Sequence, residues 1–212
     1  MNQTESTPTS TTRSRPFIVL AITALLIGLW AGYQFSRQQP SPPPQVLATI
    51  LPQPKPLLPI QLIDHDKQPF GLEQFHGKWT FLFFGYTHCP DICPATLDHV
   101  ASAFDLLSDA DLEKVKGVFV TVDPERDSPQ HLAEYVSFFH PGFIGLSGTE
   151  NQISEAARAY QVEYHRVDSD SVEKYAMIHT TYLFIIGPDG KVVDMMSHKT
   201  SPEDIAQVVR QW

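Results

Sequence analysis

The stretch Trp79–Pro94, with the sequence WTFLFFGYTHCPDICP, joins a continuous apolar run to Cys89 and Cys93, the two cysteines of the chain. Such a run is typical of a strand that is buried on both faces. The residues after Pro94 have the apolar spacing of a helix. We therefore expect both thiols at the junction of a buried strand and a helix N-terminus, where the positive end of the helix dipole stabilises thiolate.

The rest of the chain alternates between strand-like and helix-like segments. Ser128 and Thr149 are helix caps by residue type and position. Pro188-Asp189-Gly190 predicts a turn into a closing antiparallel strand. This order predicts an α/β fold with a mixed central sheet. Strands are expected at 60–63, 79–86, 115–122, 143–146, 162–167, 181–186 and 191–196, and helices at 94–107, 129–139, 150–160 and from 201 onward.

The N-terminal region divides into three parts. Residues 1–16 are polar, residues 17–35 carry no charge, and residues 36–58 are rich in proline. An apolar stretch of about 20 residues can cross a bilayer as a helix. The alternative to a membrane anchor is a cleaved signal peptide. Trp30 and Tyr33 lie near the C-terminal end of the stretch, where they suit an interfacial aromatic belt better than a cleavage site. We expect a cytoplasmic tail, a transmembrane anchor and a semi-rigid linker, followed by one folded domain over 59–212.

The charges around the apolar stretch indicate its orientation. Arg13 and Arg15 precede it and Arg37 follows it closely, which weakly favours a cytoplasmic N-terminus and an exported domain. The first sixteen residues lack the Arg-rich amphipathic pattern of a mitochondrial presequence. We therefore expect a bacterial inner membrane with the domain in the periplasm, and the mitochondrial inner membrane is the alternative.

The net charge and the number of cysteines limit the classes of function that the chain can have. The formal net charge of −9 argues against a nucleic-acid partner, which would require a basic face. Two cysteines cannot build a disulfide framework, so the pair is expected to serve a chemical function.

Three motifs carry a family resemblance. Gly85–Pro94 contains the two cysteines, Val122–Pro129 reads VDPERDSP, and His179–Gly190 leads into the closing turn. Their order and approximate spacing are similar to those of the Sco/SenC family of copper proteins. The resemblance covers about Pro59 to Trp212 and implies a thioredoxin-like fold.

The resemblance also implies a metal site and a partner. Copper, as Cu(I) or Cu(II), would be bound by Cys89, Cys93 and His179. The partner would be subunit II of cytochrome c oxidase. The protein would deliver copper to the dinuclear CuA centre of that subunit or would reduce its thiols. Another periplasmic copper chaperone is a further candidate partner. Many members of the family have aspartate before the ligand histidine, whereas this chain has Ile178, so its copper affinity and redox behaviour can differ.

The spacing of the cysteines bears on whether the pair binds a metal ion or forms a disulfide. In helical geometry their Cβ atoms would lie about 5–6 Å apart, whereas a relaxed disulfide needs about 3.5–4.5 Å. A metal ion between the sulfurs suits the wider spacing. Thr180-Thr181 stands where thioredoxin-like oxidoreductases usually carry a cis-proline, which also favours metal. Three functions stay open: a copper metallochaperone, a thiol–disulfide oxidoreductase that reduces the CuA cysteines, and a copper or redox sensor.

Other polar residues are candidates for supporting roles. His88 should point away from its cysteine neighbour because side chains alternate along a strand, and we expect it to support the site or face a partner. Asp91 is expected to be exposed, as a partner contact or a turn residue. The remaining histidines show no ligand spacing and are assigned to surface or core: His65, His76, His99, His131, His140, His165 and His198.

The acidic segment Asp123–Asp127 follows the strand at 115–122. Proline and arginine interrupt its carboxylates, which argues against a site for a hard metal ion. We interpret the segment as a scaffold loop beside the cysteines, in which Arg126 pairs with Asp127 or Glu125.

Overall fold

The computed structural model describes residues 15–38, 55–56, 60–168 and 174–211. The chain divides into two compact units, residues 1–45 and residues 46–212. Most of the predicted tail over 1–16 and of the predicted linker over 36–58 lies outside the described residues.

The segment predicted to be an anchor lies within one helix, α1 (Arg15–Gln38). Several apolar side chains of this helix are exposed, among them Leu25, Ile27 and Trp30. Within the described residues, no helix has both the length and the apolar character that crossing a membrane requires. The anchor over 17–35 stays a prediction.

The second unit is built on an eight-stranded sheet with the order β1-β10-β9-β4-β5-β6-β2-β3. Strands β4, β5 and β6 are parallel neighbours, and β9 runs antiparallel to β4. The sheet is therefore mixed, as the sequence predicts. The strands are β1 (Lys55–Pro56), β2 (Leu62–Asp64), β3 (Pro69–Phe70), β4 (Trp79–Gly85), β5 (Val115–Thr121), β6 (Phe143–Ser147), β9 (Tyr182–Ile186) and β10 (Lys191–Ser197).

The central strand β4 is buried along its whole length. Phe81 packs edge-on against Phe104 of helix α2 (Ile92–Asp105), with ring centroids 5.6 Å apart. Phe84 points to the opposite face, where it packs against Tyr160 at 5.5 Å. Because both faces are covered, the strand is a continuous apolar run.

Helices α4 (Pro129–Phe139) and α5 (Glu150–Ala159) begin after the caps that the sequence predicts. The Ser128 hydroxyl accepts a hydrogen bond from the backbone N–H of His131, and Thr149 forms a capping box with Gln152. The other helices are α3 (Asp109–Leu112), which the sequence did not predict, and α6 (Pro202–Gln211). A 3₁₀ turn, η1, lies at Leu72–Phe75.

Helix α2 begins earlier than predicted, at Ile92 instead of Pro94, with Asp91 as its N-cap residue. Proline is tolerated in a first turn because the N–H groups there have no partner within the helix. As a result Cys93 lies within the first turn of the helix.

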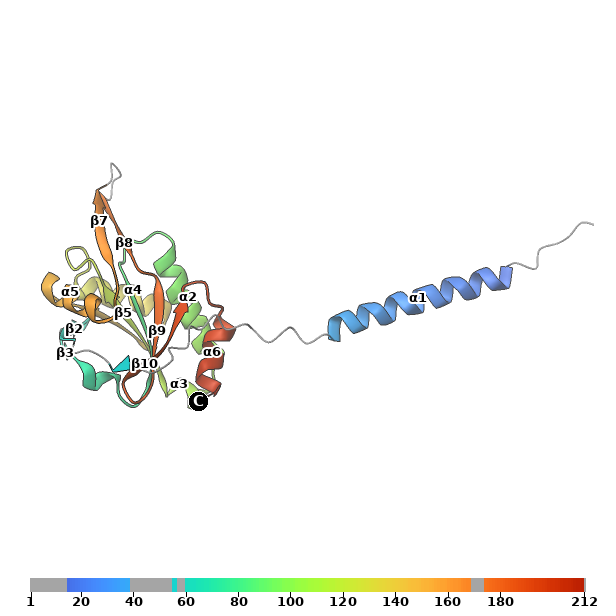
Figure 1. Ribbon diagram of the computed structural model, residues 1–212, viewed down its shortest axis with the longest axis horizontal. Coiled ribbons are helices and arrows are strands. Elements are labelled where there is room, and N and C mark those ends of the chain that lie inside the picture. The colour runs from blue at the N-terminus through green and yellow to red at the C-terminus, as the bar shows by residue number, and fades with distance from the viewer. Residues whose placement is uncertain (1–14, 39–54, 57–59, 169–173, 212) are drawn as a thin grey trace, which may run out of the picture. The chain divides into compact units, whose positions relative to one another are not determined.

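A separate two-stranded ribbon carries the predicted ligand histidine. Strands β7 (Tyr164–Asp168) and β8 (Tyr175–His179) pair antiparallel, with Tyr164 opposite His179. Figure 1 shows this ribbon extending beyond the main sheet. His179 ends β8, a strand that the sequence did not predict, and its ring packs against Phe83 of β4 and against Tyr86, which follows that strand.

Candidate metal centre

The structure brings the three predicted ligands together. One donor atom each from Cys89, Cys93 and His179 lies within 4.8 Å of the other two. The Sγ atom of Cys93 is 3.4 Å from Nε2 of His179. Both cysteines are free thiols. Two sulfurs and one imidazole nitrogen thus converge on one point.

The two cysteines sit where β4 passes into α2. Cys89 lies in the connecting loop and is partly exposed, whereas Cys93 is fully buried. The backbone N–H of Cys93 points at the Sγ atom of Cys89, 3.5 Å away. An amide of the first helical turn therefore faces the Cys89 sulfur, as expected for a thiolate at a helix N-terminus.

Gly85, the last residue of β4, makes room for the buried sulfur. A Cβ atom at this position would lie 2.9 Å from the Sγ atom of Cys93 and 2.7 Å from the ring of Phe119. Both separations are below van der Waals contact, so any side chain here would displace the Cys93 sulfur or the aromatic ring.

The imidazole of His179 is oriented for metal binding. Its Nδ1 lies 2.9 Å from the carbonyl oxygen of Thr180, to which a protonated Nδ1 donates. This bond leaves the lone pair of Nε2 directed toward Cys93, the arrangement usual for metal-binding histidines. The rings of Phe83 and Tyr86 pack against the imidazole at nearly right angles, each 5.9 Å away between centroids. The Nε2 lone pair and the two sulfurs therefore form a donor set that suits a soft metal ion.

The two thiols have opposite acid–base properties. A hydrogen bond from the Cys93 thiol lowers the pKa of Cys89 to about 3, despite an opposing effect of burial. The same hydrogen bond and burial raise the pKa of Cys93. In the metal-free protein Cys89 is thus the thiolate and Cys93 the proton donor that stabilises it.

We expect this asymmetry to appear in alkylation of the reduced, metal-free protein. Since Cys89 is already ionised, its rate of reaction with iodoacetamide should be flat above about pH 5, whereas an ordinary cysteine reacts faster up to about pH 8.5. Cys93 is protonated and buried, so it should react only after unfolding. Mass spectrometry of peptides labelled between pH 4 and pH 9 measures both rates. A Cys89 rate that still climbs tenfold per pH unit near pH 7 would contradict the assignment.

A buried carboxylate fixes the start of the cysteine loop. Asp127 is fully buried and accepts hydrogen bonds from the backbone N–H and the hydroxyl of Thr87, at 3.0 and 2.6 Å. It also accepts one from the hydroxyl of Thr121 at 2.6 Å. The segment Asp123–Asp127 thereby holds the loop two residues before Cys89, which agrees with its interpretation as a scaffold.

The predicted pairing of Arg126 is wrong in detail. Its Nε lies 2.5 Å from Oδ2 of Asp123, at i,i−3, instead of pairing with Asp127 or Glu125. The hydroxyl groups around Asp127 already satisfy that carboxylate. Glu125 instead pairs with Arg166 of strand β7, at 3.4 Å.

Tyr175 joins the same loop to the far end of β8, a contact that sequence reasoning missed. Its ring lies between the guanidinium groups of Arg126 and Arg166, at 3.7 and 3.6 Å from the ring centroid. Its hydroxyl donates to Asp123 at 2.9 Å. The stacking on Arg126 and the hydrogen bond to Asp123 thus tie the histidine-bearing ribbon to the main fold, whereas Arg166 belongs to the ribbon itself. A tyrosine far along the sequence from VDPERD gives no pattern from which this contact could be predicted.

The other candidate residues lie outside the group of three ligands. Asp91 is exposed and its side chain makes no cap hydrogen bond. The Nδ1 atom of His88 lies 3.1 Å from the Thr87 hydroxyl and 3.8 Å from Asp127. His88 therefore contacts the scaffold behind the cysteine loop.

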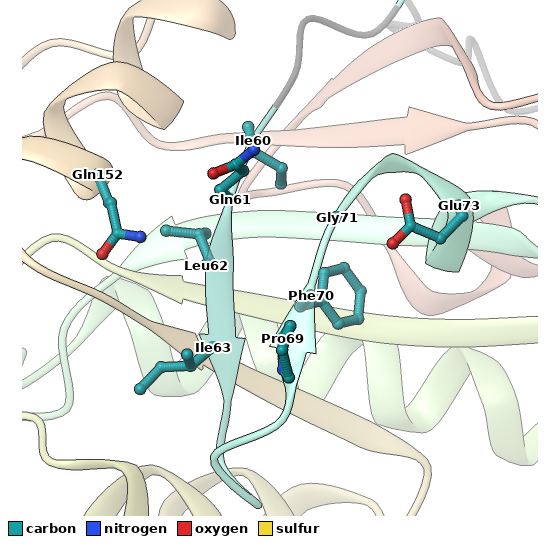
Figure 2. A pocket seen from close by; sticks show the side chains of 9 residues that line it. All are labelled: Ile60, Gln61, Leu62, Ile63, Pro69, Phe70, Gly71, Glu73 and Gln152. Atoms are coloured by element: carbon teal, nitrogen blue, oxygen red, sulfur yellow. The ribbon is translucent and has the colours of Figure 1, made fainter.

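A groove of about 520 Å³ lies along β2 and β3 (Figure 2). Figure 2 shows apolar side chains between Glu73 and Gln152, which lie at its two ends. The side chain of Gln152 is already engaged in the capping box with Thr149. Neither cysteine nor His179 lines this groove, so it belongs to a different part of the surface.

Comparison with known proteins gives a consistent match. A family model described as SCO1/SenC matches residues 54–212. The mouse protein named SCO2 homolog, mitochondrial, is 38% identical over 151 residues, which are 71% of this chain and 59% of the relative. Protein sco1 of Schizosaccharomyces pombe is 31% identical over 200 residues, which are 92% of this chain and 75% of the relative. The chain spans between half and three fifths of the mammalian relatives that it matches.

Solved structures give the same result. The crystal structure of Arabidopsis thaliana ScoI with copper bound has a TM-score of 0.68 and 35% identity, and covers 74% of this chain and 100% of that one. Yeast Sco1 with copper bound has a TM-score of 0.67 and 30% identity, and covers 74% of this chain and 88% of that one. This likeness confirms the predicted thioredoxin-like fold. Copper, the metal that the family resemblance implies, is the metal in both of these relatives.

Proposed function

The chain belongs to the SCO1/SenC family, and from this premise we propose that it is a copper-binding protein that assists assembly of the CuA centre of cytochrome c oxidase subunit II. The observation that carries the proposal is the convergence of Cys89, Cys93 and His179, with the Nε2 lone pair directed at the sulfurs.

The donor set suits copper in either oxidation state. Soft thiolates prefer Cu(I), and one added imidazole allows Cu(II) to be held as well. We propose that Cys89, Cys93 and His179 hold one copper ion per domain as cargo. Cys89 is the partly exposed sulfur and Cys93 the buried one. A thiol of the partner can therefore replace Cys89 first, while Cys93 and His179 still hold the ion, and delivery proceeds by stepwise ligand exchange.

A second candidate is reduction of the CuA cysteines. The lowered pKa of Cys89 favours it, because the thiolate is the form that attacks a disulfide. Cys89 would form a mixed disulfide with one target sulfur and release the other as a thiolate. Cys93 would then resolve the mixed disulfide, so that the target gains two electrons and the pair Cys89–Cys93 becomes oxidised. This activity needs no imidazole, whereas copper delivery needs His179.

For the location we propose that α1 anchors the domain to a membrane, with the domain on the exported side. The support is the uncharged stretch over 17–35 and the arginines that precede it. The matched mammalian relatives are named as mitochondrial. We propose a bacterial inner membrane for this chain, and the mitochondrial inner membrane is the alternative. Retention of the full chain in carbonate-washed membranes, and its release when residues 1–38 are removed, would support the anchor.

Deletion of the gene, followed by complementation, tests the function. The deletion strain should lose CuA-dependent oxidase activity, and added copper should restore part of that activity. The wild-type gene should complement fully and the His179→Ala variant should not. If His179→Ala complements fully while Cys89→Ser does not, thiol reduction is the function. If the deletion leaves oxidase activity unchanged, both proposals fail and a role as a copper or redox sensor is favoured.

A further inference from the structure

A second group of ligand-type side chains lies beside the cysteine loop. It comprises His88 of the loop, Asp127 after β5, and His131 in the first turn of α4. One donor atom from each lies within 4.8 Å of the other two. No spacing in the sequence connects these residues, because the packing of α4 against the cysteine loop brings them together. From this geometry we propose that His88, Asp127 and His131 form a second cation site, which takes a divalent ion of the Zn²⁺ class.

The Thr87 hydroxyl is the fourth polar group at this site. Its oxygen lies 2.6 Å from Oδ1 of Asp127, 3.1 Å from Nδ1 of His88 and 3.0 Å from Nε2 of His131. A hydroxyl has one proton and two lone pairs. It donates over the short contact to Asp127 and can accept an N–H from each imidazole, and an imidazole that carries its proton on the other ring nitrogen presents a lone pair to an ion at this point instead. The four polar groups thus already face one common point.

The charge of Asp127 favours a cation at that point. The carboxylate is fully buried, and its close hydrogen-bond donors are the neutral groups of Thr87 and Thr121. A buried negative charge is strongly stabilised by an adjacent cation. The two imidazoles stand between this carboxylate and solvent, since His88 is partly exposed and His131 is exposed. A small cation can therefore enter from the surface.

The distances suit a tetrahedral ion. Ligand atoms about 2.1 Å from Zn²⁺ lie roughly 3.4 Å from one another. Nδ1 of His88 and Oδ1 of Asp127 are 3.8 Å apart, so a small rotation of the surface imidazoles completes the geometry. The Thr87 oxygen or a water would be the fourth ligand. Two nitrogens and one carboxylate oxygen favour Zn²⁺ and similar divalent ions, whereas Cu(I) prefers the thiolates of the first site.

Occupancy of this site would tie α4 to the cysteine loop. His131 belongs to the helix, while His88 directly precedes Cys89. A shared ion would therefore link two elements that already meet at the Thr87 hydroxyl and through the His88 and His131 rings, and it would fix the backbone next to a copper ligand.

Zinc binding by a variant without thiols tests the proposal independently of copper. The Cys89→Ser/Cys93→Ser variant, checked for folding by circular dichroism, is titrated with Zn²⁺ against a chromophoric chelator. We expect one Zn²⁺ per chain, and at least about a tenfold loss of affinity when His131→Ala is added. Addition of His76→Ala, at an exposed histidine outside the group, is the matched control and should leave the affinity unchanged. Co²⁺ bound in the same variant should show ligand-field bands without thiolate charge transfer.

A folded variant that binds no Zn²⁺, or that binds it equally well with and without His131, would overturn the proposal. If the double serine variant does not fold, the wild type loaded with Cu(I) replaces it. Metal analysis after Zn²⁺ addition and gel filtration should then give one copper and one zinc per chain for the wild type. The His131→Ala variant, loaded in the same way, should contain one copper and no zinc. Retention of zinc by the loaded His131→Ala variant would equally count against the site.

Discussion

We expect the His179→Ala variant to bind Cu(II) at least about 100-fold more weakly than the wild type, because it loses the imidazole nitrogen that faces the two sulfurs. Cys89→Ser and Cys93→Ser should each lose tight binding of Cu(I) as well, since a single thiolate and an imidazole no longer satisfy the soft ion. Competition with a chelator of known affinity measures all three variants.

The matched control is His165→Ala. His165 is exposed on strand β7 and lies opposite Ile178 in the register, so side-chain alternation places it on the other face of the ribbon from His179. Its replacement should leave copper affinity within about a factor of two. An equal loss of copper affinity in His179→Ala and His165→Ala would mean that disturbance of the ribbon, and not removal of a ligand, weakens copper binding.

The second large effect is expected at Asp127. Alanine there leaves the Thr87 N–H, the Thr87 hydroxyl and the Thr121 hydroxyl without the carboxylate that they share. Each lost bond to a buried charge is worth about 1.5–3 kcal/mol. Because the three bonds share one acceptor and are not additive, we expect the free energy of unfolding to fall by about 3–5 kcal/mol.

Urea unfolding of the metal-free protein in the presence of a chelator measures this change. Asp98→Ala, at an exposed position of α2, is the control and should change the unfolding free energy by less than about 0.5 kcal/mol. A loss below about 1 kcal/mol for Asp127→Ala would show that water replaces the carboxylate and that the loop does not depend on it.

The features that the sequence predicts are those with local causes. The continuous apolar run predicts β4, and the caps at Ser128 and Thr149 predict the starts of α4 and α5, because each signal lies within a few residues of its effect. The start of α2 is the instructive error. Pro94 is compatible with more than one position in a first turn, so the residue type alone could not exclude a start at Ile92.

The features that the sequence does not predict depend on tertiary packing. Strand β8 is short, and its pattern of buried and exposed residues reflects a ribbon that is anchored through Tyr175. Arg126 has three carboxylates within a few residues, and only the folded loop selects Asp123. His131 has no ligand spacing to His88, and the packing of α4 against the cysteine loop alone brings the two rings within 5.8 Å.

X-ray absorption spectroscopy of the copper-loaded domain tests the central claim most directly, because it counts sulfur and nitrogen neighbours of the ion. The arrangement of Cys89, Cys93 and His179 predicts two sulfur scatterers and one imidazole nitrogen in the wild type, and loss of that imidazole signal in His179→Ala. A wild-type spectrum without imidazole, or one that His179→Ala leaves unchanged, would contradict it.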